Sequence, residues 1–191
     1  MSDLRTLRTY KLLKNSLLEL LSKNSFDNIK VNDICNLAMV HRTTFYSHFS
    51  DKYELLDYCI KDIENELLSG FKDSDYSSSK DFYTALIMNL LNYIGSNKQF
   101  YKNVMKNNYS AGIINVFHNS VIMHISTIIE KEEKRNKKSD IPISVRAEFF
   151  SGAVTSVLMW WLISNSTISK ENLCNYIISL IFDAQDWFFL F

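Results

Sequence analysis

The side chains best suited to do chemistry are concentrated in one stretch of this chain, HRTTFYSHFSDK, residues 41–52. Short hydroxyls and a long guanidinium can bond to base edges and phosphate oxygens in a DNA major groove, which is about 12 Å wide. An Arg-Thr-Thr run at residues 42–44 supplies both kinds of group. Phe45 and Phe49 lie four residues apart, so one helical face can anchor both in a core. This stretch therefore predicts recognition of nucleic acid; the alternative is an aromatic-rich core helix.

Outside that stretch the sequence offers no arrangement for catalysis or metal binding. We find no paired carboxylates, no nucleophile with a base at fixed spacing and no glycine-rich phosphate loop, so we expect no enzyme. His118 and His124 are six residues apart, about 240° around a helix, and cannot share one face. Cys35, Cys59 and Cys174 are too few and too scattered for a disulfide framework or a zinc site, and they favour a reducing cytoplasm. We expect no metal and no cofactor.

Composition and charge predict an all-α protein with an anionic partner at one end. The 191 residues include only four Gly and one Pro, too little punctuation for a turn-rich β architecture. Net charge is zero, but residues 1–52 hold eight Lys/Arg against five acids, a net of +3. The N-terminus is charged throughout, unlike a signal peptide, and the longest apolar run, residues 149–163, is shorter than the ~20 residues of a membrane span. We therefore expect a cytoplasmic protein and no membrane contact.

Hydrophobic periodicity predicts about nine helices and no strand. A charged segment, residues 130–140, and a polar one, residues 72–80, are expected to be loops. Ser50, Ser144 and Ser169 are the expected caps of three of the helices. The expected helices cover residues 4–21, 31–38, a short segment from 41, 50–70, 81–95, 99–106, a long segment through 114–128, a segment from 144 and a last one from 169.

Two short helices joined by a tight turn, between two longer helices, describe a helix-turn-helix. The stretch KVNDICNLAMVHRTTFYSHFSDKYELL, residues 30–56, resembles the DNA-binding signature of TetR/AcrR-type transcriptional regulators. The matching residues are Ile34, Ala38, Val40, Thr44, Tyr46, His48, Phe49, Lys52, Leu55 and Leu56. The resemblance implies a nine- or ten-helix subunit, a homodimer through the last two helices and a ligand-responsive C-terminal body. It places a DNA-binding domain at residues 1–67, with its motif at 30–49, and a ligand-binding and dimerisation domain at residues 68–191.

Three positions of the motif depart from the family pattern. Met39 stands at the usual turn glycine, and a left-handed conformation there would cost about 1–2 kcal/mol. His41 and Lys30 stand where Ser and Thr caps are common, and both are poorer helix caps. Both can still approach a phosphate. The complete set of expected DNA contacts is Lys30, Asn32, His41, Arg42, Thr43, Thr44, Tyr46, His48 and Lys52, with the last three and nearby cations at phosphates.

The C-terminal half gives weaker signals. Aromatic residues there can line an apolar effector pocket or simply form the core: Phe82, Phe100, Tyr101, Tyr109, Phe117 and Trp160. The tail WFFLF, residues 187–191, is expected to bury against a dimer partner, with contact to another partner or a membrane as the alternative.

The main functional hypothesis is a dimeric regulator that binds a palindromic operator, acts as a repressor and is released by a small apolar effector. The alternative is a co-activator of the same fold that binds a protein partner and no longer recognises an operator. An enzyme is the third and weakest hypothesis.

Overall fold

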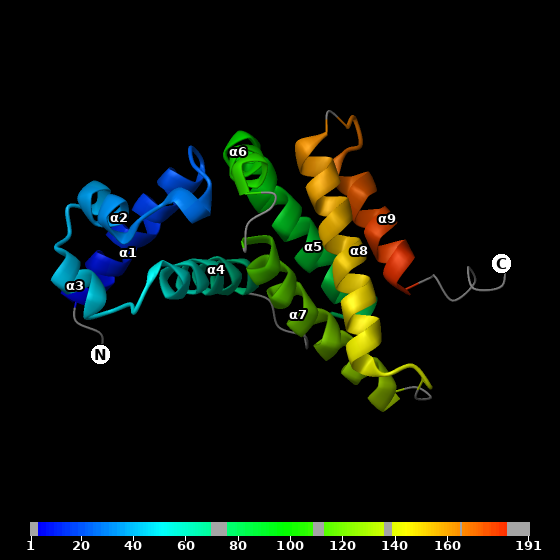
Figure 1. Cartoon of the computed structure of the whole chain (residues 1–191). Helices are drawn as coiled ribbons and strands as arrows, with labels where there is room; N and C mark the ends of the chain where they lie inside the picture. Colours follow the sequence, from blue (N-terminus) through cyan, green and yellow to red (C-terminus); the bar gives the residue numbers. More distant parts are fainter. Residues whose placement is uncertain (1–3, 70–75, 109–112, 136–138, 165, 183–191) are drawn as a thin grey trace. The chain divides into compact units, whose positions relative to one another are not determined.

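The computed structural model of the chain describes residues 4–69, 76–108, 113–135, 139–164 and 166–182 (Figure 1). Within these ranges all regular elements are helical, which confirms the expected all-α class. They are α1 (Leu4–Leu21), the 3-10 turn η1 (Phe26–Asn28), α2 (Val31–Ala38), α3 (Arg42–Tyr46), α4 (Lys52–Leu68), α5 (Ser79–Ser96), α6 (Lys98–Asn108), α7 (Ile113–Arg135), α8 (Ile143–Ile163) and α9 (Lys170–Phe182).

The helix starts agree with the sequence in some places and correct it in others. Ser169 caps α9 as expected, since its hydroxyl accepts the backbone N–H of Asn172 at 3.2 Å. The cap of α4 is Asp51 and not Ser50: one carboxylate oxygen of Asp51 accepts the backbone N–H groups of Tyr53 and Glu54 at 2.8 and 2.9 Å. Helix α8 begins directly after Pro142, before the Ser144 that we expected to cap it.

The charged segment at residues 130–140 is helical through Arg135, which corrects the expectation of a loop. Glu133 of α7 forms an ion pair with Arg146 of α8, and both side chains are largely buried. Arg146 also donates through Nε to the carbonyl of Ile141 at 3.0 Å. This contact to the next helix explains why a segment with a loop-like composition continues the helix.

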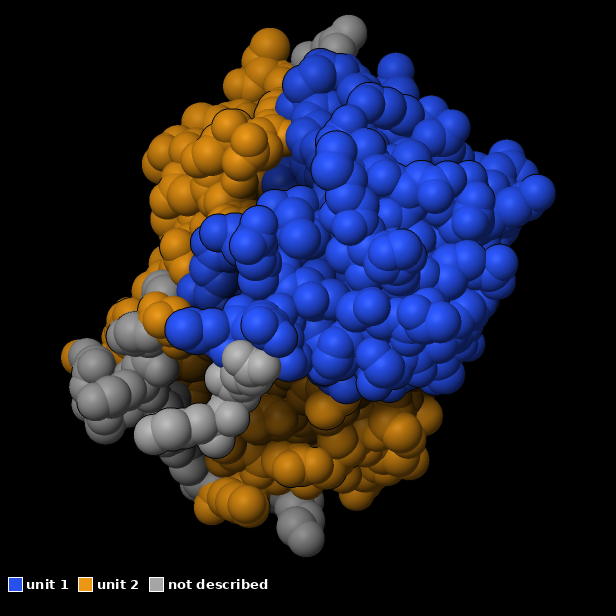
Figure 2. Space-filling view, turned by 90° about the vertical axis from the view of Figure 1, so that its left-hand side faces the viewer, with its two compact units in different colours: residues 1–66, 99–116 blue, residues 67–98, 117–191 orange. Residues whose placement is uncertain are grey.

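The chain forms two compact units, each made of separate segments of the sequence (Figure 2). The first unit comprises residues 1–66 and 99–116, and the second comprises residues 67–98 and 117–191. The single boundary near residue 67 that the sequence suggested does not include residues 99–116, which also belong to the first unit. Almost all of α6 belongs with the N-terminal helices.

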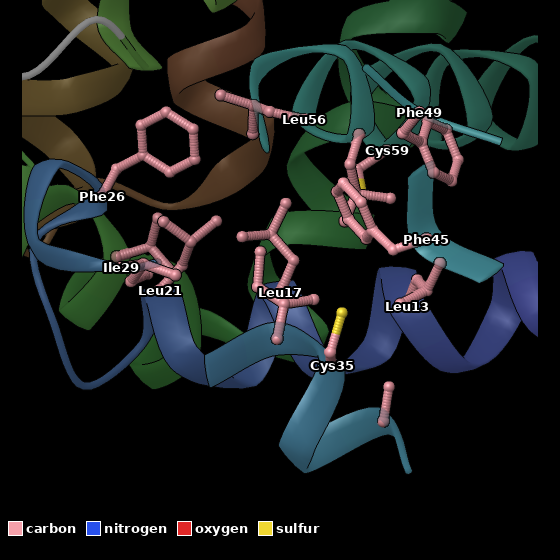
Figure 3. Packing of buried hydrophobic residues seen from close by; sticks show 14 residues of the cluster. Leu13, Leu17, Leu21, Phe26, Ile29, Cys35, Phe45, Phe49, Leu56 and Cys59 are labelled. Carbon is pink, nitrogen blue, oxygen red and sulfur yellow. The ribbon is translucent and has the colours of Figure 1, made fainter. Parts of the chain in front are cut away.

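The core of the first unit is built from leucines of α1 and aromatic residues that follow it. Leu13, Leu17, Phe26 and Phe45 have no exposed surface, and Val104 of α6 joins them. Figure 3 shows Phe45 and Phe49 directed into this cluster. The ammonium of Lys14 on α1 also contacts the carboxylate of Asp62 on α4. Apolar burial of this kind is the main favourable contribution to folding.

The second unit has its own core around the packing of α5 against α9. Leu91 of α5 and Cys174 of α9 are fully buried. At the edge of this contact the ammonium of Lys170 donates to the side-chain oxygen of Asn92 at 2.6 Å. Within the described ranges no helix has the length and apolar content needed to cross a membrane.

Candidate nucleic-acid interface

The turn between α2 and α3 is made by a residue in the left-handed conformation, Met39, with φ 54° and ψ 41°. Its backbone N–H bonds to the carbonyl of Asn36, and the next N–H, of Val40, bonds to Cys35 at 3.0 Å. The Met39 side chain is 95% exposed, so packing does not compensate the conformation. A non-glycine residue here costs about 1–2 kcal/mol. The chain therefore makes a left-handed turn here without a glycine.

The two weak caps of the motif behave differently. Neither His41 before α3 nor Lys30 before α2 makes a side-chain cap hydrogen bond. At α2, however, Asp33 accepts the backbone N–H of Lys30 at 2.9 Å, which is half of a capping box. The sequence carried this signal, an acid three residues after the cap position. Helix α3 has no such substitute within the described residues, so its first backbone N–H groups remain available.

Phe45 and Phe49 anchor the motif to the core, as their spacing suggests. They are 0% and 4% exposed. Helix α3 ends at Tyr46, but the N–H of Phe49 still bonds to the carbonyl of Phe45 at 2.9 Å, so the helical turn continues to the second anchor. The ring of Tyr10 on α1 lies 5.0 Å from that of Phe49. The anchors fix which side of α3 faces outward.

The outward side of α3 presents a cation, hydroxyls and one aromatic ring. Arg42 and Thr43 are exposed and Tyr46 is half exposed. The guanidinium carbon of Arg42 lies 5.8 Å from the centre of the Tyr46 ring, a cation–π contact that orients both side chains. Arg42, Thr43, Tyr46 and Ser47 line a shallow open hollow. Among the described residues Arg42 has no ion-pair partner, so its charge is available to a phosphate or guanine.

The other residues that we expected to contact DNA have varied surroundings. Lys30, Asn32 and His41 are exposed, and Thr44 is partly buried. The ring of His48 packs edge-on against Tyr10 at 5.1 Å, which leaves it partly accessible.

Lys52 makes contacts inside the domain that the sequence did not suggest. Its ammonium donates to the carbonyls of Phe26, Asp27 and Ile29 at 2.7, 3.1 and 2.8 Å. It also lies 4.6 Å from the centre of the Phe26 ring. An ammonium has three N–H donors, and all three are used within the domain. Lys52 therefore holds the segment between α1 and α2, a role that the sequence did not suggest.

The cysteines of the first unit are inert. Burial raises the pKa of the Cys35 thiol, although the positive charge of Arg42 opposes this shift. Burial likewise raises the pKa of Cys59 to about 12. Because the thiolate is the reactive form, neither residue is a nucleophile. The described side chains also contain no group of three metal-ligating residues.

The described residues that we expected to line an effector pocket are divided between the two units. Phe82 packs against the core of the second unit, whereas Phe100 packs against the core of the first. Tyr101 stacks edge-on against Phe100 at 5.1 Å, and Trp160 is 51% exposed on α8. Tyr109 and the side chain of Phe117 lie outside the described residues. The described residues of this set therefore lie against two different cores and at the surface.

Asn108, the last residue of α6, is a residue that no sequence pattern selects. It is fully buried in the first unit, and its side-chain oxygen accepts the N–H of Phe26 at 2.6 Å. Its partner lies 82 residues away in the chain, so no local pattern could have identified the contact.

Comparison with known proteins covers both units. Residues 16–59 match the family model described as "Bacterial regulatory proteins, tetR family", and residues 81–183 match one described as "Transcriptional regulator C-terminal region". The dhaKLM operon transcriptional activator DhaS of Lactococcus lactis is 24% identical over 181 residues, which cover 93% of this chain and 90% of that protein.

Solved structures show the same fold. A TetR transcriptional regulator from Streptococcus agalactiae superposes with a TM-score of 0.67 at 23% identity, over 93% of this chain and 95% of that one. A TetR-family regulator from Syntrophomonas wolfei gives the same TM-score at 18% identity, over 90% and 92%. The structure of a dihydroxyacetone kinase operon activator, DhaS, gives 0.56 at 22% identity, over 94% and 97%.

Proposed function

Because this chain belongs to the TetR family and is a transcriptional regulator rather than an enzyme, we propose that it binds a palindromic DNA operator as a homodimer. The observation that carries the proposal is the set of side chains exposed on the outward side of α3. Its two phenylalanine anchors are buried, while Arg42, Thr43 and Tyr46 are exposed beside an uncapped helix start. Arginine and threonine suit base edges and phosphates, and a tyrosine hydroxyl suits a phosphate.

The homodimer is supported by apolar side chains on the surface of the last two described helices. On α8, Val145, Phe149 and Trp160 are 55%, 66% and 51% exposed. Their spacings of four and eleven residues place them on one stripe of the helix. On α9, Tyr176 and Leu180 are similarly exposed and lie four residues apart. Such stripes are typical of surfaces that a second subunit covers. A dimer can place two recognition helices about 34–36 Å apart, one DNA turn.

DNA binding is tested by selecting fragments of the source genome with the full chain, starting with DNA upstream of its own gene. Arg42→Ala and Tyr46→Ala are each expected to weaken binding to the selected site, and the loss at Arg42 should be roughly 1–3 kcal/mol, as for a base contact. Tyr53→Ala is a matched control, since Tyr53 is about as exposed as Tyr46 but is the second residue of α4. Absence of any enriched fragment, or unchanged affinity of both variants, contradicts the proposal.

Dimerisation is tested separately by sedimentation. Phe149→Glu is expected to raise the dimer dissociation constant at least about thirtyfold, the effect of losing a central apolar contact. Leu37→Glu, at an exposed leucine of α2, is the control and should leave the dimer intact. A dimer unaffected by Phe149→Glu would place the interface elsewhere.

For regulation, we propose that this is a cytoplasmic repressor that a small apolar effector releases from DNA. The proposal is supported by family membership and by the aromatic core of the second unit, with Phe82, Tyr83 and Phe150. An effector acts only through a difference in affinity between the two states of the dimer. Deletion of the gene should raise expression of the adjacent operon. A fall in expression instead would make the protein an activator.

A second candidate, a co-activator that binds another protein, is favoured by two observations. The related DhaS is a transcriptional activator of an operon. The turn of the motif also exposes apolar side chains, Leu37 at 41% and Met39 at 95%. Affinity capture with the full chain and with Leu37→Glu distinguishes the candidates. A co-activator should enrich one protein partner, lose it in the variant and select no DNA.

A further inference from the structure

Asn108, at the end of α6, is a fully buried polar residue with every group in use. Its side-chain oxygen accepts the N–H of Phe26 at 2.6 Å, and its amide donates to the carbonyls of Val104 and Leu21 at 2.7 and 3.4 Å. Next to it, Asn107 donates to the carbonyl of Ser22 at 3.1 Å. All of these residues belong to the first unit. The end of α6 is thereby bonded to the connection between α1 and α2.

The same connection is bonded from its other side by the start of α4. Phe26 donates its N–H to Asn108, and its carbonyl accepts a hydrogen bond from the ammonium of Lys52 at 2.7 Å. The same ammonium also donates to the carbonyl of Ile29, the residue directly before the cap residue of α2. Asn108, Phe26 and Lys52 thus form a continuous polar path. It runs from α6 to the starts of α2 and α4, the two helices that flank α3.

Directional contacts of this kind fix geometry more tightly than apolar packing. An apolar side chain of similar size would fill the same space but allow the segment to slide, whereas a buried hydrogen bond allows one arrangement. Breaking one partner leaves the other buried and unsatisfied, which is costly. The path therefore holds α6 and the elements around α3 in a single arrangement.

We propose that Asn108 is a positioning residue for DNA binding: through Phe26 and Lys52 it sets the placement of α2 and α4 around α3. This inference rests on the proposed function, because it concerns how the DNA-binding helix is held. It names no contact between Asn108 and DNA.

The test is a set of operator affinities measured with the full chain, at a temperature where circular dichroism shows every variant folded. Asn108→Leu and Lys52→Met are each expected to weaken affinity roughly tenfold, the middle of the range for residues that couple sites. The double variant should be no weaker than the weaker single variant, because both changes break the same path. Asn103→Leu is the matched control, since its side-chain hydrogen bond, from Gln99 at 2.8 Å, stays within α6.

A purely structural role gives a different pattern. It predicts that folded Asn108→Leu binds the operator like the wild type, or that the two effects add, and either result overturns the inference alone. Should Asn108→Leu fail to fold, Asn108→Ala takes its place with the same expected tenfold loss. Wild-type protein that binds no DNA fragment overturns the proposed function and the inference together.

Discussion

Two helix starts that lie ten residues apart, those of α3 and α4, use their polar groups in opposite ways. At α4, Asp51 accepts two backbone N–H groups, Glu54 accepts the N–H of Ser50 at 2.6 Å, and Lys52 donates to three carbonyls. At α3, the cap residue His41 makes no side-chain hydrogen bond and Arg42 is exposed. The polar groups of one helix start are used inside the domain, and those of the other are exposed. Two cations of the same short motif can therefore have opposite surroundings.

The largest effect is expected from a change in the hydrophobic core that lies behind both helix starts. Phe45→Ala removes a fully buried ring behind α3 and should destabilise the first unit by about 3–5 kcal/mol. Thiol labelling shows where the damage lies, because Cys59 is buried in the first unit and Cys174 in the second. Cys59 should become reactive and Cys174 should not. Tyr46→Ala, one residue further on and half exposed, is the control. Equal labelling of both cysteines would show that the units do not open separately.

The next effect separates the two helix starts directly. Asp51→Ala should cost about 1 kcal/mol, because two backbone N–H groups of α4 lose their acceptor. His41→Ala should leave the stability unchanged, since there is no cap to lose. Chemical denaturation of both variants measures the difference. A loss at His41 as large as that at Asp51 would break the comparison.

A substitution in the turn before α3 should raise the stability of the protein. Met39→Gly removes the cost of a left-handed conformation, about 1–2 kcal/mol. Glycine in turn loses more conformational entropy on folding, which costs ~0.5–1 kcal/mol. The net expectation is a rise in stability of up to roughly 1 kcal/mol. The melting temperature checks it, with Asn36→Gly on α2 as a control that should be destabilising. A destabilised Met39→Gly would mean that the exposed side chain has a contact of its own.

The smallest effect is a pH dependence at the start of α4. Hydrogen bonds from Ser50 lower the pKa of the Glu54 carboxyl below its ordinary value of 4.5. A carboxyl with a lowered pKa in the folded state stabilises the protein above the unfolded value and loses this contribution as pH falls through the folded value. Between pH 6 and pH 3 the wild type should therefore lose more stability than Glu54→Gln. Parallel curves for the two proteins would contradict this.

The sequence predicted the motif well because local signals determine it. Helix α2 has the bounds that its apolar spacing suggested, and Phe45 and Phe49 are buried as their spacing of four required. Met39 adopts the left-handed turn because the hydrogen bonds around it need that geometry whatever the side chain.

What the sequence could not give depends on contacts between distant residues. Lys52 appears as a phosphate contact in the linear motif, and only the fold brings it to carbonyls 23 to 26 residues away. Asn108 gains its meaning from Phe26, 82 residues distant. The helix through Arg135 depends on the ion pair between Glu133 and Arg146. In each case a polar group has several plausible partners, and long-range packing selects one.

The most direct test of the central claim compares the two cations by the salt dependence of operator binding. Each phosphate contact adds about 0.9 to the slope of log affinity against log salt concentration. Arg42→Ala should reduce the slope by about one for each half-site, because its charge reaches the DNA. Lys52→Met should weaken binding but leave the slope unchanged, because its charge is used inside the domain. A reduced slope for Lys52→Met together with an unchanged slope for Arg42→Ala would contradict the account.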